Sequence, residues 1–157
     1  MGLCRGLNIE MYYSIILDNL FVGGCPVSQS DVNTLRELGI TAVLNLQNDD
    51  DFKYWKIDYD MLLSAYEQSH ISLVRYPIRD FDIADLQRRL EGGVNALQDL
   101  IEHQTVYLHC SAGINRSPTI AIAFLMKSKQ MSLEEALDYF RKKHYCEPYI
   151  EALKKII

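Results

Sequence analysis

Hydrophobic and polar positions follow two periods in turn along the chain, which predicts strands and helices that alternate. Short β-branched and apolar runs between turn residues are typical of buried strands, and apolar residues three and four positions apart are typical of amphipathic helices. The strand-like runs are 13–16 and 20–23, which form a hairpin, and 41–46, 73–77 and 105–108. The helix-like segments are 28–38, parts of 52–69, 84–103, 119–126, 132–143 and 148–157. This order predicts an α/β fold with a central, mainly parallel sheet flanked by helices.

The ends and the packing of two helices can be read from single residues. Ser132 with Glu135 three positions later is a capping box, which begins the helix that runs to about residue 143. In the segment 84–103, Gly92 and Gly93 lie in the middle of a helix, where each costs about 1 kcal/mol relative to alanine. We therefore expect another part of the chain to pack closely against these glycines.

The composition is that of one globular domain. The chain has 157 residues, of which 48% are hydrophobic and 24% charged, and this length suffices for one hydrophobic core. We assign residues 12–157 to the domain and residues 1–11 to an N-terminal tail. No stretch has the length of a membrane span, and no signal-peptide pattern is present. We therefore expect a soluble intracellular protein without integral membrane association, and a monomer.

Charge and cysteine usage narrow the partners and the compartment. The net charge of −5 disfavours nucleic acid and anionic membranes as partners. The four cysteines lack the spacing of a disulfide framework, which indicates a reducing compartment. We interpret Cys4, Cys25 and Cys146 as bystanders, and a regulatory disulfide of Cys110 with Cys25 or Cys146 remains an open alternative.

The acidic and histidine residues outside the central motif show no metal-ligand spacing. The run 49–51 consists of three aspartates, which we interpret as a solvated turn. His70, His103 and His144 lie in polar surroundings, and we interpret them as surface residues. We expect neither a metal nor another cofactor.

One segment carries the chemistry: residues 109–118, which read His-Cys-Ser-Ala-Gly-Ile-Asn-Arg-Ser-Pro. It joins a predicted buried strand to a predicted buried helix, and a helix N-terminus with free backbone N–H groups binds anions. A helix N-terminus and a nearby cation also favour the thiolate form of a cysteine. Arg116 presents a planar fork that can hold two phosphate oxygens. The segment therefore predicts a nucleophile, Cys110, directed at a phosphate; the alternative is a buried structural cysteine beside a surface arginine.

The other residues of this segment have supporting roles in that interpretation. The loop from Cys110 to Arg116 would bind the phosphate oxygens through its backbone amides, as an oxyanion hole does. His109 is expected to orient the loop through hydrogen bonds, and Ser117 to donate a hydrogen bond to the sulfur when it leaves. The expected phosphate-binding residues are Ser111, Ala112, Gly113, Ile114, Asn115 and Arg116.

The segment resembles the signature loop HCxxGxxR[ST] of the dual-specificity branch of the cysteine-dependent phosphatases. The resemblance implies their single-domain fold and a two-step reaction through a phosphocysteine, without a metal. Such a reaction needs an acid for the leaving oxygen and a base for water. Asp80, about thirty residues before Cys110, is our first choice for this group. Asp82 is the alternative, although it is also placed to cap the helix that begins near residue 84.

Segments outside the loop are similar to the plant and algal phosphoglucan phosphatases of the starch-excess type, over about residues 13–157. The similar segments are 20–25, 31–36, 46–51 and 78–86. The resemblance implies removal of phosphate from starch-like glucan, and a plastid as an alternative to the cytoplasm. Tyr54, Trp55 and Phe81 match aromatic positions that line the glucan channel of that family, and Tyr13 matches another. Asn115 departs from the glycine that the family prefers, and we expect it to narrow the mouth of the pocket.

Other substrates and roles are open to the same residues. A dual-specificity protein phosphatase would use the same loop and acid on phosphotyrosine, phosphoserine or phosphothreonine, and the aromatic residues would then line a general substrate groove. An RNA 5′-triphosphatase has a similar Gly-Ile-Asn-Arg run but normally a basic face, which the net charge of −5 does not provide. A catalytically inactive binding module would lack Cys110, Arg116 or the acid, and this chain retains all three.

Overall fold

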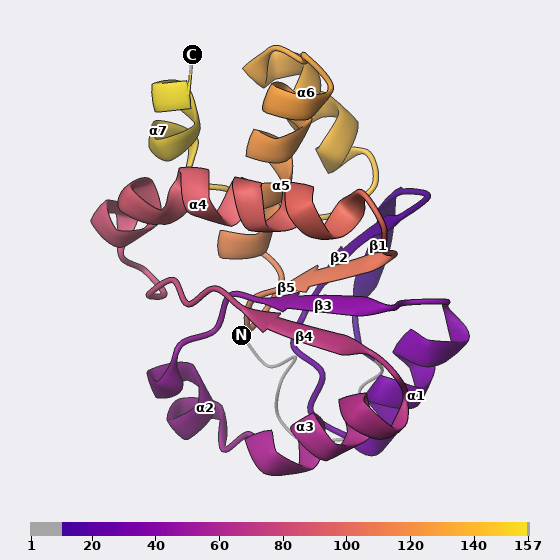
Figure 1. Cartoon of the computed structure of the whole chain (residues 1–157). Helices are drawn as coiled ribbons and strands as arrows, with labels where there is room; N and C mark the ends of the chain where they lie inside the picture. The colour runs from indigo at the N-terminus through magenta and orange to yellow at the C-terminus, as the bar shows by residue number, and fades with distance from the viewer. Residues whose placement is uncertain (1–10, 157) are drawn as a thin grey trace.

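One mixed, mostly parallel sheet lies at the centre of the protein in the computed structural model, which describes residues 11–156 (Figure 1). The first strand of the chain lies at one edge of the sheet and pairs antiparallel with the second. The three other pairs of neighbouring strands are parallel. The predicted hairpin and the mainly parallel sheet are therefore confirmed. In spatial order the strands are β1 (Tyr13–Leu17), β2 (Leu20–Gly23), β5 (Val106–His109), β3 (Ala42–Asn45) and β4 (Ser72–Arg75).

Helices cover both faces of the sheet (Figure 1). The helices of one face are α4 (Ile83–Ile101), α5 (Arg116–Ser128), α6 (Leu133–Arg141) and α7 (Ile150–Leu153), which a 3-10 turn, Lys154–Ile156, follows. The helices of the other face are α1 (Gln29–Glu37), α2 (Asp49–Trp55) and α3 (Tyr59–Gln68). Each face buries its own apolar cluster, because residues alternate between the two faces of a strand. None of the helices within residues 11–156 is long and apolar enough to cross a membrane.

The glycine pair in α4 permits the close packing that the sequence predicts. A Cβ atom on Gly92 would collide with the ring of Tyr76, and one on Gly93 would lie 2.7 Å from Cδ1 of Ile120 on α5. The two glycines therefore let α4 approach both the segment after β4 and helix α5.

Two helical segments differ from the prediction. Helix α2 begins at Asp49, inside the predicted turn, because Asn48 and Asp51 form a capping box of the same kind as Ser132 and Glu135. The predicted final helix is shorter, with one α-helical turn and a 3-10 turn, and Tyr149 rather than Pro148 is its N-cap. The predicted tail of residues 1–11 and its Cys4 lie outside the described residues, except for Met11.

Three neighbouring strands place the segments that carry the candidate chemistry at one edge of the sheet. Strands β3, β5 and β4 are parallel, so the segments that leave their carboxyl ends lie next to one another. These segments are 46–48 with α2, 110–115, and 76–82. Ligands of open α/β sheets commonly bind at the carboxyl ends of the strands, and this edge is where the site lies.

Candidate active site

The loop of residues 110–115 is held in place by its carbonyl groups. The backbone N–H groups of Cys25 and Glu147 donate to the carbonyls of Ser111 and Ile114 at 2.9 and 2.8 Å, and Nε2 of His144 lies 2.7 Å from the carbonyl of Gly113. In a planar trans peptide the N–H points away from the C=O. The N–H groups that follow these three carbonyls therefore point away from the bracing residues, which leaves them available to an anion.

Cys110 lies at the start of this loop and is buried, with 3% of its surface exposed. Its Sγ is 3.3 Å from the hydroxyl of Ser117 in the first turn of α5, as the predicted role of Ser117 requires. Nδ1 of His109 lies 2.8 Å from the carbonyl of Cys110. Burial lowers the pKa of His109 to about 4, so the imidazole is neutral at pH 7 and Nδ1–H is the donor. His109 is therefore placed to orient the loop by hydrogen bonding.

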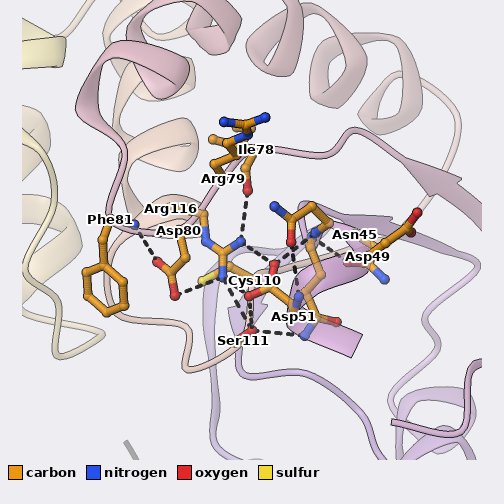
Figure 2. A network of polar contacts seen from close by, with 12 residues as sticks. Asn45, Asp49, Asp51, Ile78, Arg79, Asp80, Phe81, Cys110, Ser111 and Arg116 are labelled. Carbon is orange, nitrogen blue, oxygen red and sulfur yellow. Dashed lines mark hydrogen bonds and ion pairs between the residues drawn. The ribbon is translucent and has the colours of Figure 1, made fainter. Parts of the chain in front are cut away.

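The guanidinium of Arg116 is the centre of a buried polar network (Figure 2). Its Nη1 and Nη2 donate to the two carboxylate oxygens of Asp51 at 2.8 and 3.0 Å, and Nη1 also donates to the carbonyl of Ile78 at 2.9 Å. The hydroxyl of Ser111 donates to Asp51 at 3.0 Å. Burial by itself would lower the pKa of Arg116, but the hydrogen bonds to Asp51 and the charges around it raise that pKa above the ordinary value.

Asp80 and Asp82 occupy different environments. Oδ2 of Asp80 is 3.2 Å from Nη2 of Arg116, and its side chain is 29% exposed (Figure 2). Partial burial raises the pKa of Asp80 and the charge of Asp51 adds to this, whereas Arg116 and the N–H of Phe81 oppose it. Asp82 instead caps α4, where its carboxylate accepts from the N–H of Asp85 at 2.9 Å. Of the two aspartates, Asp80 alone lines the pocket around Cys110.

The predicted aromatic residues, except one, lie around this pocket, which has a volume of about 760 Å³. Tyr54 and Phe81 are 67% and 73% exposed, and the rings of Tyr54 and Trp55 contact each other edge to face at 4.8 Å. Tyr13 does not line the pocket, because its side chain packs against Phe21 beside the apolar cluster under α1 and α3. The lining residues are Asn48, Asp50, Asp51, Tyr54, Trp55, Arg79, Asp80, Phe81, Cys110, Ser111, Ala112, Ile114, Asn115, Arg116 and Glu147.

Asn115 lines the pocket, and its side chain also holds the neighbouring segment at Glu147 in place. Its Nδ2 donates to the backbone carbonyl of Glu147 at 2.8 Å. Together with the bond from the N–H of Glu147 to Ile114, this contact fixes the segment after α6 against the loop. The sequence did not identify Glu147 as a part of the site.

Two sequence interpretations are wrong because they missed polar residues that are buried. Asp51 is 6% exposed and bonded to Arg116, so it does not belong to a solvated turn. His144 is 1% exposed and bonded to the loop, whereas His70 and His103 are exposed as predicted. The spacing of Asn48 and Asp51 was a signal for a helix start, but no local signal pointed to the arginine. Within the described residues, no group of three or more His, Cys, Asp or Glu side chains could hold a metal ion.

Known proteins resemble this chain in sequence and in structure. The family profile described as "Dual specificity phosphatase, catalytic domain" matches residues 20–152. The chloroplastic phosphoglucan phosphatase LSF1 of Arabidopsis thaliana is 34% identical over 89% of this chain and 24% of its own length. The amyloplastic phosphoglucan phosphatase DSP4 of Castanea sativa is 32% identical over 90% and 39%, respectively. The chain thus spans about a quarter of the length of LSF1 and about two fifths of the length of DSP4. The crystal structure of Tk-PTP in the active form aligns with a TM-score of 0.75 at 25% identity, over 92% of this chain and 95% of that one.

Proposed function

The chain belongs to the dual-specificity phosphatases, and we propose that it removes phosphate from starch-like glucan through a phosphocysteine intermediate. The relatives named for phosphoglucan support this substrate, and so does the wall of the pocket. The observation that carries the proposal is the pair of exposed aromatic rings, Tyr54 and Phe81, on the pocket that contains Cys110.

The first step transfers the phosphoryl group to the enzyme. The thiolate of Cys110 attacks phosphorus, so that an S–P bond forms while the bond from phosphorus to the sugar oxygen breaks. The carboxylic acid of Asp80 gives its proton to the departing sugar oxygen. Arg116 and the loop amides hold the three remaining phosphate oxygens, where charge is spread in the transition state.

The second step returns the enzyme to its starting state. The carboxylate of Asp80 takes a proton from water, and the water oxygen attacks phosphorus while the S–P bond breaks. The Ser117 hydroxyl, 3.3 Å from the sulfur, donates a hydrogen bond to the thiolate that leaves. Phosphate is released, and Asp80 is again protonated for the next cycle.

The aromatic rings are exposed in a way that favours a sugar ligand. Phe81 has a φ of 56°, a left-handed conformation that costs a non-glycine residue roughly 1–2 kcal/mol. This strained backbone holds an apolar ring in solvent beside Asp80, where packing provides no compensation. Aromatic faces offer apolar area to a flat ligand, and a sugar ring has a face of this kind.

The charge of the pocket wall favours a substrate that is neutral apart from one phosphate. Even without Asp80, which acts as the acid, the lining has three carboxylates (Asp50, Asp51 and Glu147) against the two guanidiniums of Arg79 and Arg116. An excess of negative charge repels polyanions such as an RNA triphosphate. A phosphotyrosine peptide is the second candidate substrate, because the family also acts on proteins and the same loop and acid would serve.

The test compares phosphate release from phosphorylated amylopectin, a phosphotyrosine peptide and an RNA 5′-triphosphate. We expect Tyr54→Ala and Phe81→Ala each to lower kcat/KM for amylopectin about 10-fold, the effect of roughly 1.4 kcal/mol of lost contact. Neither variant should change the hydrolysis of p-nitrophenyl phosphate, because this small substrate does not reach the exposed rings of Tyr54 and Phe81. Ile15→Ala removes another exposed apolar side chain, on β1, and should change neither activity.

Each part of the proposal has its own contrary result. Hydrolysis of the peptide with amylopectin untouched would refute the glucan substrate and leave the phosphatase. Activity retained on every substrate in Cys110→Ser would refute the phosphocysteine mechanism.

A further inference from the structure

The carboxylate of Asp51 covers one edge of the Arg116 guanidinium, and Nε on another edge has no partner among residues 11–156. Both hydrogens of Nη1 have acceptors, the carboxylate of Asp51 and the carbonyl of Ile78. Nη2 bonds to the second oxygen of Asp51, so the carboxylate covers the edge between the two terminal nitrogens. Nη2 also has two longer contacts, to the hydroxyl of Ser111 at 3.3 Å and to Oδ2 of Asp80 at 3.2 Å. Nε is buried and has no partner within residues 11–156. A phosphate would therefore bind along the edge formed by Nε and Nη2, where its oxygens replace only the longer contacts of Nη2.

We propose that Asp51 is a positioning residue: it fixes which edge of Arg116 faces the phosphate, and it leaves Asp80 free to act as the acid. The inference deepens the proposed phosphatase reaction and rests on it. Asp51 does not touch the reacting atoms, and it acts through the arginine.

Asp51 is held rigidly enough to orient another side chain. It lies in the first turn of α2, where its Oδ2 accepts from the N–H of Asn48 at 2.8 Å in a capping box. Its Oδ1 accepts from the hydroxyl of Ser111, which in turn accepts from Nε2 of Gln47 at 3.0 Å. With the two bonds from Arg116, each carboxylate oxygen therefore has two donors (Figure 2). A buried side chain with all of these bonds has one orientation, and so has the arginine that it binds.

The second carboxylate near Arg116, that of Asp80, is held by fewer bonds. Asp80 makes one contact with the guanidinium, at 3.2 Å, and is partly open to the pocket. Burial raises the pKa of Asp80, and the charge of Asp51 adds to this, which favours the protonated form of the group that must donate a proton. Without Asp51, Asp80 would be the remaining carboxylate partner of a buried arginine. That ion pair would favour the ionised form of Asp80, which cannot act as an acid.

The test is Asp51→Asn, assayed with p-nitrophenyl phosphate and with phosphorylated amylopectin. We expect kcat/KM for p-nitrophenyl phosphate to fall about 100-fold, chiefly through KM, because the arginine loses its fixed orientation. We also measure kcat on amylopectin as a function of pH. The basic limb of this pH profile, where kcat falls as the pH rises, should move to lower pH, because Asp80 then gives up its proton more readily. A residue that only stabilised the fold would not move this limb.

Two control variants separate this effect from other consequences of the change. Asp31→Asn removes an equivalent capping box, on α1, where the carboxylate accepts from the N–H of Ser28. Asp49→Asn removes the same charge from the same turn of α2, at an exposed residue paired with Arg75. Both should keep the pH profile and KM of the wild type. In an Arg116→Lys background, Asp51→Asn should have little further effect, because the residue acts through the arginine.

The outcomes distinguish this inference from the proposed function. If Cys110→Ser is inactive while a folded Asp51→Asn keeps the wild-type KM and basic limb, the positioning role is refuted and the mechanism stands. If Asp51→Asn does not fold, Asp51→Glu decides, since it keeps the charge but displaces the oxygens. It should retain the basic limb of the wild type with a raised KM; an unchanged KM would overturn the inference.

Discussion

The acid role of Asp80 leads to a prediction about two substrates with different leaving groups. A sugar hydroxyl is a poor leaving group that must be protonated as it departs, whereas p-nitrophenolate leaves without help. In Asp80→Ala we therefore expect kcat for phosphorylated amylopectin to fall by about 10² to 10³, within the usual range for a positioned acid. The loss of kcat on p-nitrophenyl phosphate should be below about 10-fold.

The magnitude follows from where the structure places the carboxyl group. Asp80 is the aspartate that reaches the pocket from the segment after β4, and its side chain is 29% exposed, so water can replace part of its function. A loss of 10² to 10³ corresponds to about 3–4 kcal/mol of transition-state stabilisation. Because burial raises the pKa of Asp80, activity persists above the ordinary range of an aspartate and falls as the pH rises through that pKa. This basic limb should be absent in Asp80→Ala.

The matched control is Asp82→Ala, two residues further along the chain. Its carboxylate caps α4, so the change should lower the free energy of unfolding by about 1 kcal/mol and leave kcat on both substrates unchanged. Steady-state kinetics across pH and denaturant unfolding of both variants measure these effects. The reasoning is refuted if the two variants exchange behaviour, or if Asp80→Ala slows both substrates equally.

Two further predictions concern the loop itself. Gly113→Ala should lower kcat/KM by more than 10-fold and should also lower the Tm. The reason is that Gly113 has a φ of 74°, and a Cβ there would collide with the backbone of Gly23. Unchanged kinetics and melting would contradict this packing. Since burial lowers the pKa of His109 from 6.5 to about 4, the unfolded chain binds a proton first as the pH falls, and stability is lost between pH 6.5 and 4. The loss is on the order of 3 kcal/mol at pH 4, and denaturant unfolding at several pH values should show a smaller loss in His109→Gln; equal losses would show that another group causes it.

Local patterns in the sequence were sufficient for most of the fold. Strand β5 and helix α5 follow from a β-branched run and an apolar run, because periodicity records which face of an element is buried. The start of α6 followed from its capping box, whose two residues are three positions apart. The predicted roles of Cys110 and Arg116 likewise rest on residues within one short loop, whose spacing is meaningful without knowledge of distant segments.

Contacts between distant segments were decided only by the tertiary structure. Asp51 binds Arg116 across 65 positions, and His144 braces the loop at Gly113 across 31. Tyr13 has the residue type of a channel lining, yet its strand directs it into an apolar cluster. Polarity in the sequence indicates that a side chain needs water or a partner, but it does not say which. The answer depends on the tertiary structure, in which β3, β4 and β5 end side by side. There Asp51 is a buried partner of Arg116, whereas Asp49 and Asp50 of the same acidic run are exposed to solvent.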